Sequence, residues 1–248
     1  MKKKLFSLLL SVSLLVAQCA FAENTAETFS TGDYEYVLLE NDTATITRYI
    51  GSDSEVTVPD TLDGHTVSGI GEAAFGGAGF KEITIPDSIT SIGIAAFNHC
   101  DSLTEVVIPD GVTMIDIATF ADCAALEKIT LPESVTSIGD SAFASCFKLT
   151  EIEIPNSVTY IGVYAFPSTA LTKIVIPDSV TTIGEGAFGW CYDLRTVTLP
   201  ESVPDLDLSN VFKEVLGGIK FIVPTGSNSE KLCKDASVKY TYLDADSK

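Results

Sequence analysis

Basic and histidine side chains are scarce in this sequence. Its 248 residues include 15 Lys and Arg against 34 Asp and Glu, for a formal net charge of −19, and only two His. Nucleic-acid binding depends on Lys and Arg that neutralise phosphates, and attraction to an anionic membrane needs the same groups, so we expect neither partner. Two histidines also leave few candidates for a general base or a metal site. The hydrophobic content of 46% is nevertheless enough for a sizeable core.

Recognisable catalytic motifs are missing as well. His65 lies in an insertion and His99 in a loop, and neither is near the strained nucleophile of a hydrolase triad. The glycine-rich segment 76–79 is not followed by Lys-Ser or Lys-Thr, as a phosphate-binding loop would be. His99 beside Cys100 could form a pair of metal ligands, but we favour a loop histidine that faces solvent. We therefore predict a protein that is not an enzyme and needs no cofactor.

Residues 1–22 have the pattern of a secretory signal peptide. Lys2–Lys4 are basic, residues 5–17 are apolar, and the segment ending at Ala22 reads Ala-Phe-Ala, which predicts cleavage after Ala22. The apolar run is shorter than the roughly 20 residues of a membrane span, and no second run follows. An uncleaved anchor and lipidation at Cys19 are less favoured alternatives. We expect a secreted or cell-surface protein without a membrane span.

The rest of the chain repeats with a period of about 23 residues. Prolines recur at intervals of 23, 23, 23, 22 and 23 residues, and phenylalanine, isoleucine and leucine keep the same period. Several residue types that recur with one common period predict a solenoid, in which each repeat forms one coil. A coil of this length is too short to bury its own apolar face and must stack on its neighbours. The rows are Pro86, Pro109, Pro132, Pro155, Pro177 and Pro200; Phe97, Phe120, Phe143, Phe166 and Phe188; Ile92, Ile115, Ile138, Ile161 and Ile183; and Leu103, Leu126, Leu149, Leu171 and Leu194.

Each coil is expected to contain two short extended segments. The segment before each proline alternates, so that Val106 and Ile108 point inward and Val107 outward, and the proline ends the strand. A second extended segment, of the type Ser-Val-Thr-Ser-Ile-Gly, leads into a short helical turn that buries the phenylalanine ring. The glycine of this segment is replaced only by Asp116, which suggests a left-handed backbone there, because Asp tolerates that conformation.

Seven such coils are predicted over residues 59–223. Residues 23–58 are expected to form a β-hairpin cap and a first strand, and residues 224–248 a C-terminal cap and tail. An end coil has fewer neighbours, so truncation of Phe212 is expected to cost less stability than truncation of Phe143. The expected cap elements are a hairpin of 34–39 with 44–49, a helix over 229–236, a strand over 238–243 and a frayed tail over 244–248.

Two units resemble the repeat of BspA-type leucine-rich-repeat proteins. Residues 176–194 read IPDSVTTIGEGAFGWCYDL, and residues 131–149 read LPESVTSIGDSAFASCFKL. The resemblance covers about residues 34–243 and implies an α/β repeat fold. The implied fold is a right-handed leucine-rich-repeat solenoid of about seven coils of 22–27 residues, with parallel strands on its concave side. It also implies a secreted or surface-displayed bacterial protein, of a kind associated with adhesion, and it supplies no catalytic residues.

Four cysteines share one repeat position. A disulfide framework is one interpretation for a secreted protein. We favour buried, reduced thiols, because equivalent positions in stacked coils have parallel Cβ vectors, which is a poor start for a bridge. A row of thiols also does not converge as a zinc site requires. The row is Cys100, Cys123, Cys146 and Cys191, and Cys233 lies far away in the C-terminal cap.

The residue after most of the prolines is acidic. A row of carboxylates can coordinate Ca²⁺, but we favour turn chemistry, in which Asp bonds to the backbone two residues on. The row is Asp60, Asp87, Asp110, Glu133, Asp178 and Glu201, with Asn156 in one place.

The outward strand positions are the candidate partner-binding surface. Their β-branched and mixed-charge side chains could dock an extended protein surface, or could serve only as cross-strand pairs. Trp190 and Tyr192 flank Cys191 and should therefore point outward, either as a binding hot spot or as rings that lie over the next coil. The candidate strand residues are Glu105, Val107, Lys128, Thr130, Glu151, Glu153, Lys173 and Val175.

Together these features predict a secreted, non-catalytic protein–protein interaction module that is adhesin- or effector-like. We expect a monomer whose partner is an extracellular protein, such as a host matrix protein or a microbial surface protein. An extracellular glycan-binding solenoid is one alternative, for which Trp190 and Tyr192 would supply the aromatic rings. A structural scaffold of a surface display system is the other alternative.

Overall fold

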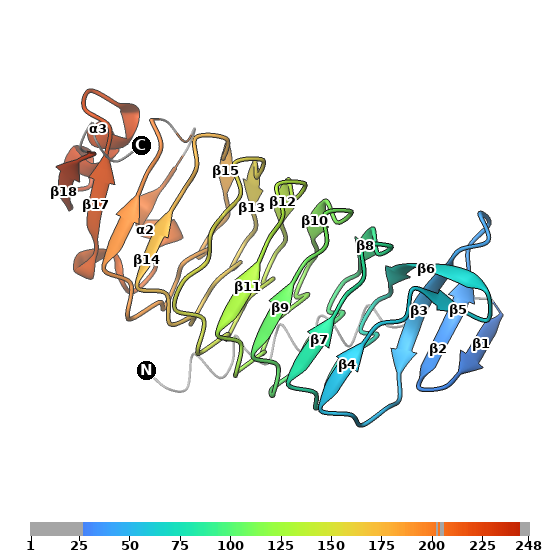
Figure 1. Cartoon of the computed structure of the whole chain (residues 1–248). Coiled ribbons are helices and arrows are strands. Elements are labelled where there is room, and N and C mark those ends of the chain that lie inside the picture. The colour runs from blue at the N-terminus through green and yellow to red at the C-terminus, as the bar shows by residue number, and fades with distance from the viewer. Residues whose placement is uncertain (1–26, 202, 204–205, 244–248) are drawn as a thin grey trace.

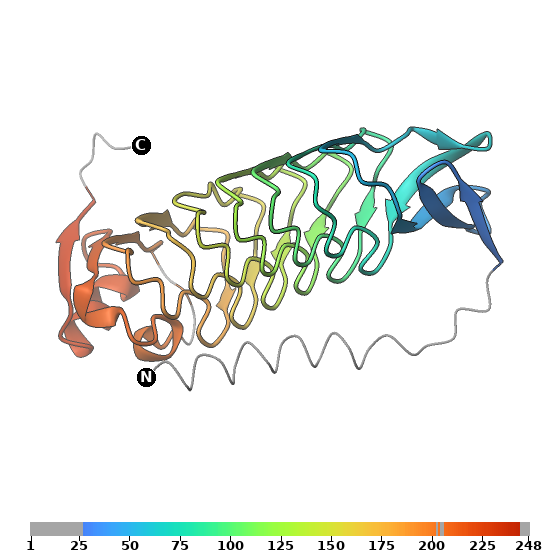
Figure 2. The same ribbon diagram turned by 90° about the horizontal axis from the view of Figure 1, so that it is seen from below.

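The protein is a stack of similar coils that advance along a nearly straight axis (Figures 1 and 2). The structure is a computed structural model, and it describes residues 27–201, 203 and 206–243. The expected signal peptide and C-terminal tail lie outside the described residues. The solenoid predicted from the repeats is confirmed, although it has about nine turns rather than seven. The number is higher because both caps continue the strand ladders of the repeats.

The segments before the prolines form parallel ladders along one face of the stack. The strands of the first ladder are β4 (Glu55–Thr57), β7 (Glu82–Thr84), β9 (Glu105–Val107) and β11 (Lys128–Thr130). A second ladder contains β14 (Lys173–Val175) and β16 (Thr196–Thr198), followed by two strands of the C-terminal cap. Each strand has a buried central residue between two more exposed ones, because successive side chains of a strand point to opposite faces.

One predicted strand is missing between the two ladders. Residues 151–154 keep the alternation of exposed and buried side chains, but they are not hydrogen-bonded as a strand. The expectation of a strand before every proline is therefore wrong at this coil. The break lies beside the one repeat that is a residue shorter than the others, which begins at Pro155.

The second extended segments form another, narrower parallel ladder. It runs through β10 (Met114–Ile115), β12 (Ser137–Ile138), β13 (Tyr160–Ile161) and β15 (Thr182–Ile183), while β8 (Ser91–Ile92) pairs with the N-terminal cap. The segments between this ladder and the next strand form consecutive turns, not the helical turn expected from the sequence. In one of them the amide of Asn98 donates to the carbonyl of Ala95, and Ala95 has a φ of 54°.

The two caps close the ends of the stack, as the fold class predicts. At the N-terminus β2 (Tyr34–Leu38) pairs antiparallel with β1 (Thr28–Thr31) and with β3 (Ala44–Tyr49). The strand β3 then pairs in parallel with β6 (His65–Ile70), which forms a hairpin with β5 (Thr61–Leu62). At the C-terminus the order of elements is α2 (Leu208–Val211), a 3₁₀ turn η1 (Leu216–Gly218), β17 (Lys220–Val223), α3 (Asn228–Asp235) and β18 (Lys239–Tyr242).

The core is a column of stacked phenylalanine rings, with one ring from each coil. Neighbouring centroids are 5.1–5.7 Å apart, and the ring planes are within 19° of parallel. This spacing is slightly larger than the 4.7–4.9 Å between neighbouring strands, so the rings follow the rise of the coils. The column consists of Phe75, Phe97, Phe120, Phe143, Phe166, Phe188 and Phe212, all buried.

The glycine row marks a close approach between coils, not a left-handed backbone. A Cβ on Gly139 would lie 2.7 Å from the carbonyl carbon of Asp116, and a Cβ on Gly184 would lie 2.4 Å from the amide nitrogen of Val163. Neither glycine has a positive φ, and neither does Asp116. The positive φ angles fall two and six residues later in each coil, as at Ser141 and Ser145. The reason inferred from Asp116 is therefore wrong, and backbone contact explains the row instead.

Truncation of Phe143 should leave a cavity between two coils that cannot collapse. We expect Phe143→Ala to lower the free energy of unfolding by about 3–5 kcal/mol, measured by chemical denaturation. Phe147→Ala, an exposed site in the same coil, is the control and should change stability by less than about 0.5 kcal/mol. In the structure Phe212 lies between Phe188 and Phe221, so we now expect Phe212→Ala to cost about as much as Phe143→Ala. A small loss at Phe212 would restore the expectation from the sequence.

The glycine row allows a second test of the contacts between coils. We expect Gly139→Ala to destabilise the protein by about 1–3 kcal/mol, because the added methyl group meets the backbone of the preceding coil. Gly79→Ala is the matched control, since a Cβ there has no neighbouring atom within 4 Å and Gly79 has no positive φ. Equal melting temperatures for the two variants would argue against the close approach.

Candidate functional site

The candidate surface is the outer side of the ladders formed by the segments before the prolines, which we call the strand face. Its side chains come from two rows, the first and third residues of each strand. Val107 and Val175 are 55% and 58% exposed on it, although their neighbours Val106 and Ile174 are buried. The charged candidates Glu105, Lys128, Glu151, Glu153 and Lys173 and the polar Thr130 are also exposed. No described element covers this face in Figure 1.

Ion pairs join neighbouring coils in the middle of the strand face. The ammonium of Lys128 lies 2.6 Å from a carboxylate oxygen of Glu105, and that of Lys173 lies 3.4 Å from Glu151. Register explains the first pair, because the two residues are direct partners of β9 and β11. Exposed pairs of this kind contribute only about 0–1 kcal/mol, so these charges are not needed to hold the fold.

Trp190 and Tyr192 do not form one exposed pair. Tyr192 is 61% exposed, but the ring of Trp190 is half-buried and stacks on Tyr164 of the preceding coil, with centroids 5.8 Å apart. Lys213 lies 5.5 Å from the centroid of the Tyr164 ring and also forms an ion pair with Glu185. This ion pair raises the pKa of Lys213 and lowers that of Glu185. Trp190 thus packs over another coil, as the second predicted arrangement has it, but over the preceding coil and not the next one.

Phe147 is an exposed aromatic residue that the sequence analysis missed. It is 55% exposed and follows Cys146 as Tyr192 follows Cys191, so both rings occupy the same position in their coils. The intervening coil has the small Ala170 at this position. Two coil steps of about 5 Å put the two positions roughly 10 Å apart, and each lies four residues before the first strand-face position of its coil, at Glu151 and Thr196. When the repeats are aligned, Phe147 and Tyr192 are the large residues at a position where other coils have Asp101, Ala124 and Ala170. This contrast could have identified the two rings from the sequence.

Departures from the repeat concentrate near these two rings. The coil between them is the short one, and Thr169 replaces the cysteine in it. The strand ladder is interrupted at 151–154, in the coil that precedes it. The hydroxyl of the buried Thr169 donates to the carbonyl of Phe166 at 3.0 Å and lies 3.2 Å from the sulfur of Cys191. In a repeat protein such irregular coils are the places where function is expected to override the local pattern.

The cysteine row lies in the core beside the phenylalanine column. Cys100, Cys123, Cys146 and Cys191 are free and fully buried, and so is Cys233. Each thiol of the row donates a weak hydrogen bond to a phenylalanine carbonyl of a preceding coil, at 3.1–3.2 Å. Burial raises the pKa of Cys100 to about 12 and that of Cys191 to about 11.

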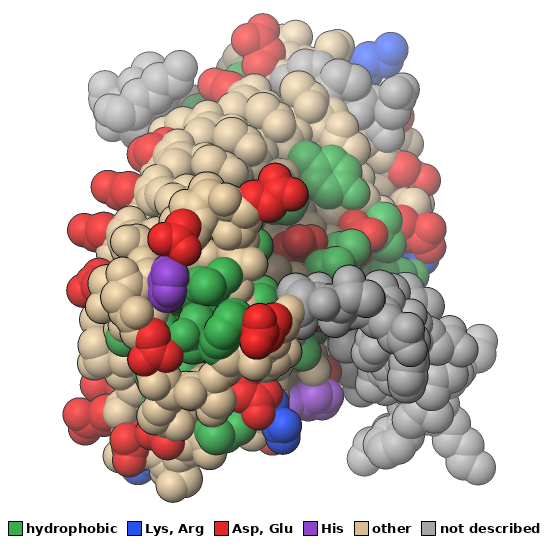
Figure 3. Space-filling view, turned by 90° about the vertical axis from the view of Figure 1, so that its right-hand side faces the viewer, with side chains coloured by type: hydrophobic (Ala, Val, Ile, Leu, Met, Phe, Trp, Pro, Cys, Tyr) green, Lys and Arg blue, Asp and Glu red, His purple; other side chains and the backbone are tan. Residues whose placement is uncertain are grey.

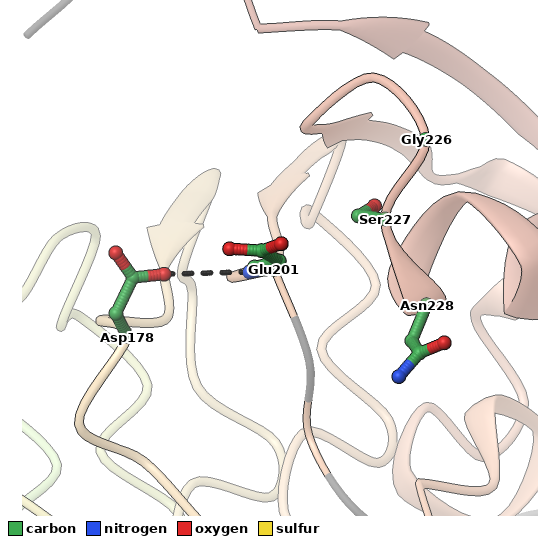
Figure 4. Close-up of a pocket in the computed structure, with 5 residues that line it drawn as sticks. All are labelled: Asp178, Glu201, Gly226, Ser227 and Asn228. Atoms are coloured by element: carbon green, nitrogen blue, oxygen red, sulfur yellow. Dashed lines mark hydrogen bonds between the residues drawn. The ribbon is translucent and has the colours of Figure 1, made fainter.

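At its C-terminal end the acidic row bonds to the backbone of the next coil, and not to the backbone two residues on as the turn interpretation expected. Asp178 and Glu201 line a surface hollow of about 470 Å³ with Gly226, Ser227 and Asn228 (Figure 4). The Asp178 carboxylate accepts a hydrogen bond from the amide of Glu201 in the next coil at 3.3 Å, and the Ser227 hydroxyl accepts the amide of Glu230 at the start of α3. Among the described residues no group of three or more His, Cys, Asp or Glu side chains converges on a metal position.

Neither histidine lies in a catalytic arrangement. His65 approaches Asp42 at 3.0 Å in the N-terminal cap, and His99 lies 3.7 Å from Asp122 in an exposed turn.

The surface around the N-terminal end is mainly acidic. Figure 3, which looks at the stack from the N-terminal cap, shows many carboxylates and few basic groups around the outline. A second hollow of about 300 Å³ lies beside β8 and β10 and is lined mainly by Thr, Ser and Gly with Met114.

Comparison with known proteins identifies the repeat. The sequence profile of the BspA type leucine rich repeat region matches in six copies, over residues 68–195 and 160–229. The chain belongs to this family. A crystal structure of a T. pallidum leucine rich repeat protein is 26% identical, with a TM-score of 0.69 over 88% of this chain and all of that one. A leucine rich cell surface protein from Faecalibacterium prausnitzii is also 26% identical, with a TM-score of 0.57 over 90% and 74%. No curated protein sequence matches.

The BspA-type repeat is of a bacterial surface-protein type, and its family and fold are generally non-catalytic. Its leucines and isoleucines point into the core, so specificity has to come from the outward positions of each coil. Among the described residues, no helix is both long and apolar enough to cross a membrane.

Burial of the cysteine row should protect its thiols. In residues 23–248 at pH 8 we expect almost no reaction of the native protein with a thiol reagent, and five free thiols after denaturation. Stability should fall as the pH rises above about 9, because the unfolded thiols ionise there while those of Cys100 and Cys191 remain protonated. Two intact disulfide bridges in the denatured protein would contradict the free-thiol arrangement.

Proposed function

We propose that the protein is a secreted, non-catalytic interaction module that binds an extracellular protein through the strand face. The observation that carries this proposal is the open strip of outward strand residues, bordered by two exposed aromatic rings, Phe147 and Tyr192. The apolar pattern before Ala22 supports export to the extracellular side. Adhesion to a host matrix or microbial surface protein is the form of binding that fits the family.

The two rings have the character of an interface hot spot. Exposed Phe and Tyr side chains supply large contact areas at small entropic cost, and hot spots are enriched in aromatic residues within a polar rim. Charged residues surround them here, including the pair of Lys148 and Glu127 at 3.1 Å and the neighbouring Arg195. The small Ala170 lies at the equivalent position of the coil between them, so it leaves more room there than the large residue on either side.

A glycan could also stack on these rings, and this is the second candidate function. The charged strand rows beside them favour a protein, because a neutral sugar would leave their ionic groups without partners. The two candidates predict different sensitivities. A protein partner should respond to Val107 and Val175, which lie on strands away from the rings, whereas a short glycan should not.

Binding should depend on the strand face and its aromatic border. Residues 23–248 serve as bait for extracellular proteins, and the affinity of the captured partner is then measured by surface plasmon resonance. We expect Phe147→Ala and Tyr192→Ala each to weaken binding by about 30-fold, and Val107→Asp with Val175→Asp to weaken it further. The controls are Met114→Ala and Tyr160→Ala, which are 45% and 37% exposed on the second ladder.

The controls should bind as the unchanged protein does, with the same circular dichroism spectrum for all variants. Equal losses in the control variants would move the binding surface away from the strand face. Binding that survives the valine changes, is lost with the aromatic changes and disappears after deglycosylation of the partner would support the glycan alternative.

A further inference from the structure

Charge is ordered along the strand face from one end of the stack to the other. The parallel register aligns Glu55, Glu82, Glu105 and Lys128 as the first residues of successive strands. The same row continues past the interruption as Lys173, Thr196, Lys220 and Lys239. Carboxylates therefore come first and ammonium groups last.

We propose that the partner binds this face in a single direction, with cationic side chains over β4 and β7 and carboxylates over β17 and β18. This inference rests on the proposed function, because it specifies the partner chemistry of the same strand face. From Glu55 to Lys220 the row crosses seven coil steps of about 4.8 Å, or roughly 34 Å. That length is several times the Debye length of about 10 Å at 0.1 M salt, so the two ends attract charges independently.

The charges at the two ends are available for a partner. In the middle, Lys128 pairs with Glu105 and Lys173 with Glu151. At the ends, the described structure gives no ion pair and no side-chain hydrogen bond to Glu55, Glu82, Lys220 or Lys239. Two adjacent carboxylates in a ladder repel each other, which costs stability unless a counter-charge is supplied from outside. The arrangement thus has a neutralised centre and two unneutralised ends of opposite sign.

The charges that flank the row make its acidic end the stronger one. Asp60, Asp87 and Asp110 follow the prolines beside that end, against a single Lys81. Asp178 and Glu201 flank the basic end and reduce its field, although Arg195 adds to it. We expect the acidic end to attract a cationic segment of the partner before contact. The lysines at the other end should then determine the direction in which the bound partner lies. Electrostatic complementarity of this kind changes association rate and orientation more than affinity.

Direction can be tested with a synthetic peptide probe of zero net charge. The peptide Lys-Lys-Lys-Ser-Gly-Trp-Gly-Ser-Glu-Glu-Glu spans about 36 Å when extended, which matches the row. It carries a nitroxide at either its basic end or its acidic end, and binding to isotope-labelled residues 23–248 is followed by NMR at 0.05 M NaCl. With the label at the basic end, we expect amide signals of β4 and β7 to broaden more than those of β16 and β17. With the label at the acidic end, the pattern should reverse.

Charge-reversal variants provide the control for direction. Glu55→Lys, Glu82→Lys and Glu105→Lys together should weaken peptide binding by about tenfold. Adding Lys173→Glu, Lys220→Glu and Lys239→Glu should restore binding with the broadening pattern reversed. The matched control changes three exposed acids elsewhere, Glu40→Lys, Glu72→Lys and Asp235→Lys, and should alter affinity by less than about twofold at 0.15 M NaCl.

Broadening that is equal at both ends, or unchanged in the reversed variant, would overturn the single direction while leaving the strand face as a binding surface. Absence of peptide binding at millimolar concentration would also overturn it. The proposed function itself fails on a separate result, namely normal partner binding by the valine and aromatic variants. The two failures are therefore distinguishable.

Discussion

The rise from one coil to the next is the constraint on which the rest of this structure depends. A single spacing of about 5 Å has to suit backbone hydrogen bonds between coils and the thickness of an aromatic ring. The backbone bonds are ordinary ones, such as 2.9 Å from the amide of Phe97 to the carbonyl of Thr119. The rings meet the same spacing, with 5.2 Å between the centroids of Phe97 and Phe120. Where the coils come still closer, only the loss of a Cβ makes room, as at Gly139 and Gly184.

The same constraint explains how a regular core leaves a variable surface. Every inward position is fixed by the coil above and the coil below, so Phe, Cys, Ile and Leu recur with few exceptions. Outward side chains contact only the equivalent residues of neighbouring coils and solvent. Substitution of one of them therefore changes the free energy of unfolding by only a few tenths of a kcal/mol. The large side chains Phe147 and Tyr192, and the change of charge along the strand face, are therefore free to serve recognition.

The repeat period made the core of this fold predictable from sequence. One position has one environment in every coil, so the burial of Phe143 or Cys146 could be inferred from its row alone. Features that depend on distances between coils could not be inferred in this way. Stacking of Trp190 on Tyr164 involves two different repeat positions, and the close approach at Gly139 is a contact with the backbone of another coil. The inference from Asp116 failed for this reason, since Asp116 has no positive φ and the glycines of its row are defined by contacts between coils.

The candidate site was only partly predictable, because a binding surface is defined by departures from the repeat. Alternation marks the outward residues of the strand rows, whereas Phe147 was missed because the residue at its position varies from coil to coil. Its meaning emerged from its alignment with Tyr192 across the short coil around Ala170. The strongly acidic composition was also only a partial guide to the binding surface. A net charge of −19 describes the whole body, which repels other acidic molecules, yet the local sign changes along one row of strands. For a protein whose core is nearly identical in every coil, the order of such local differences along the stack is what distinguishes one end from the other for a partner.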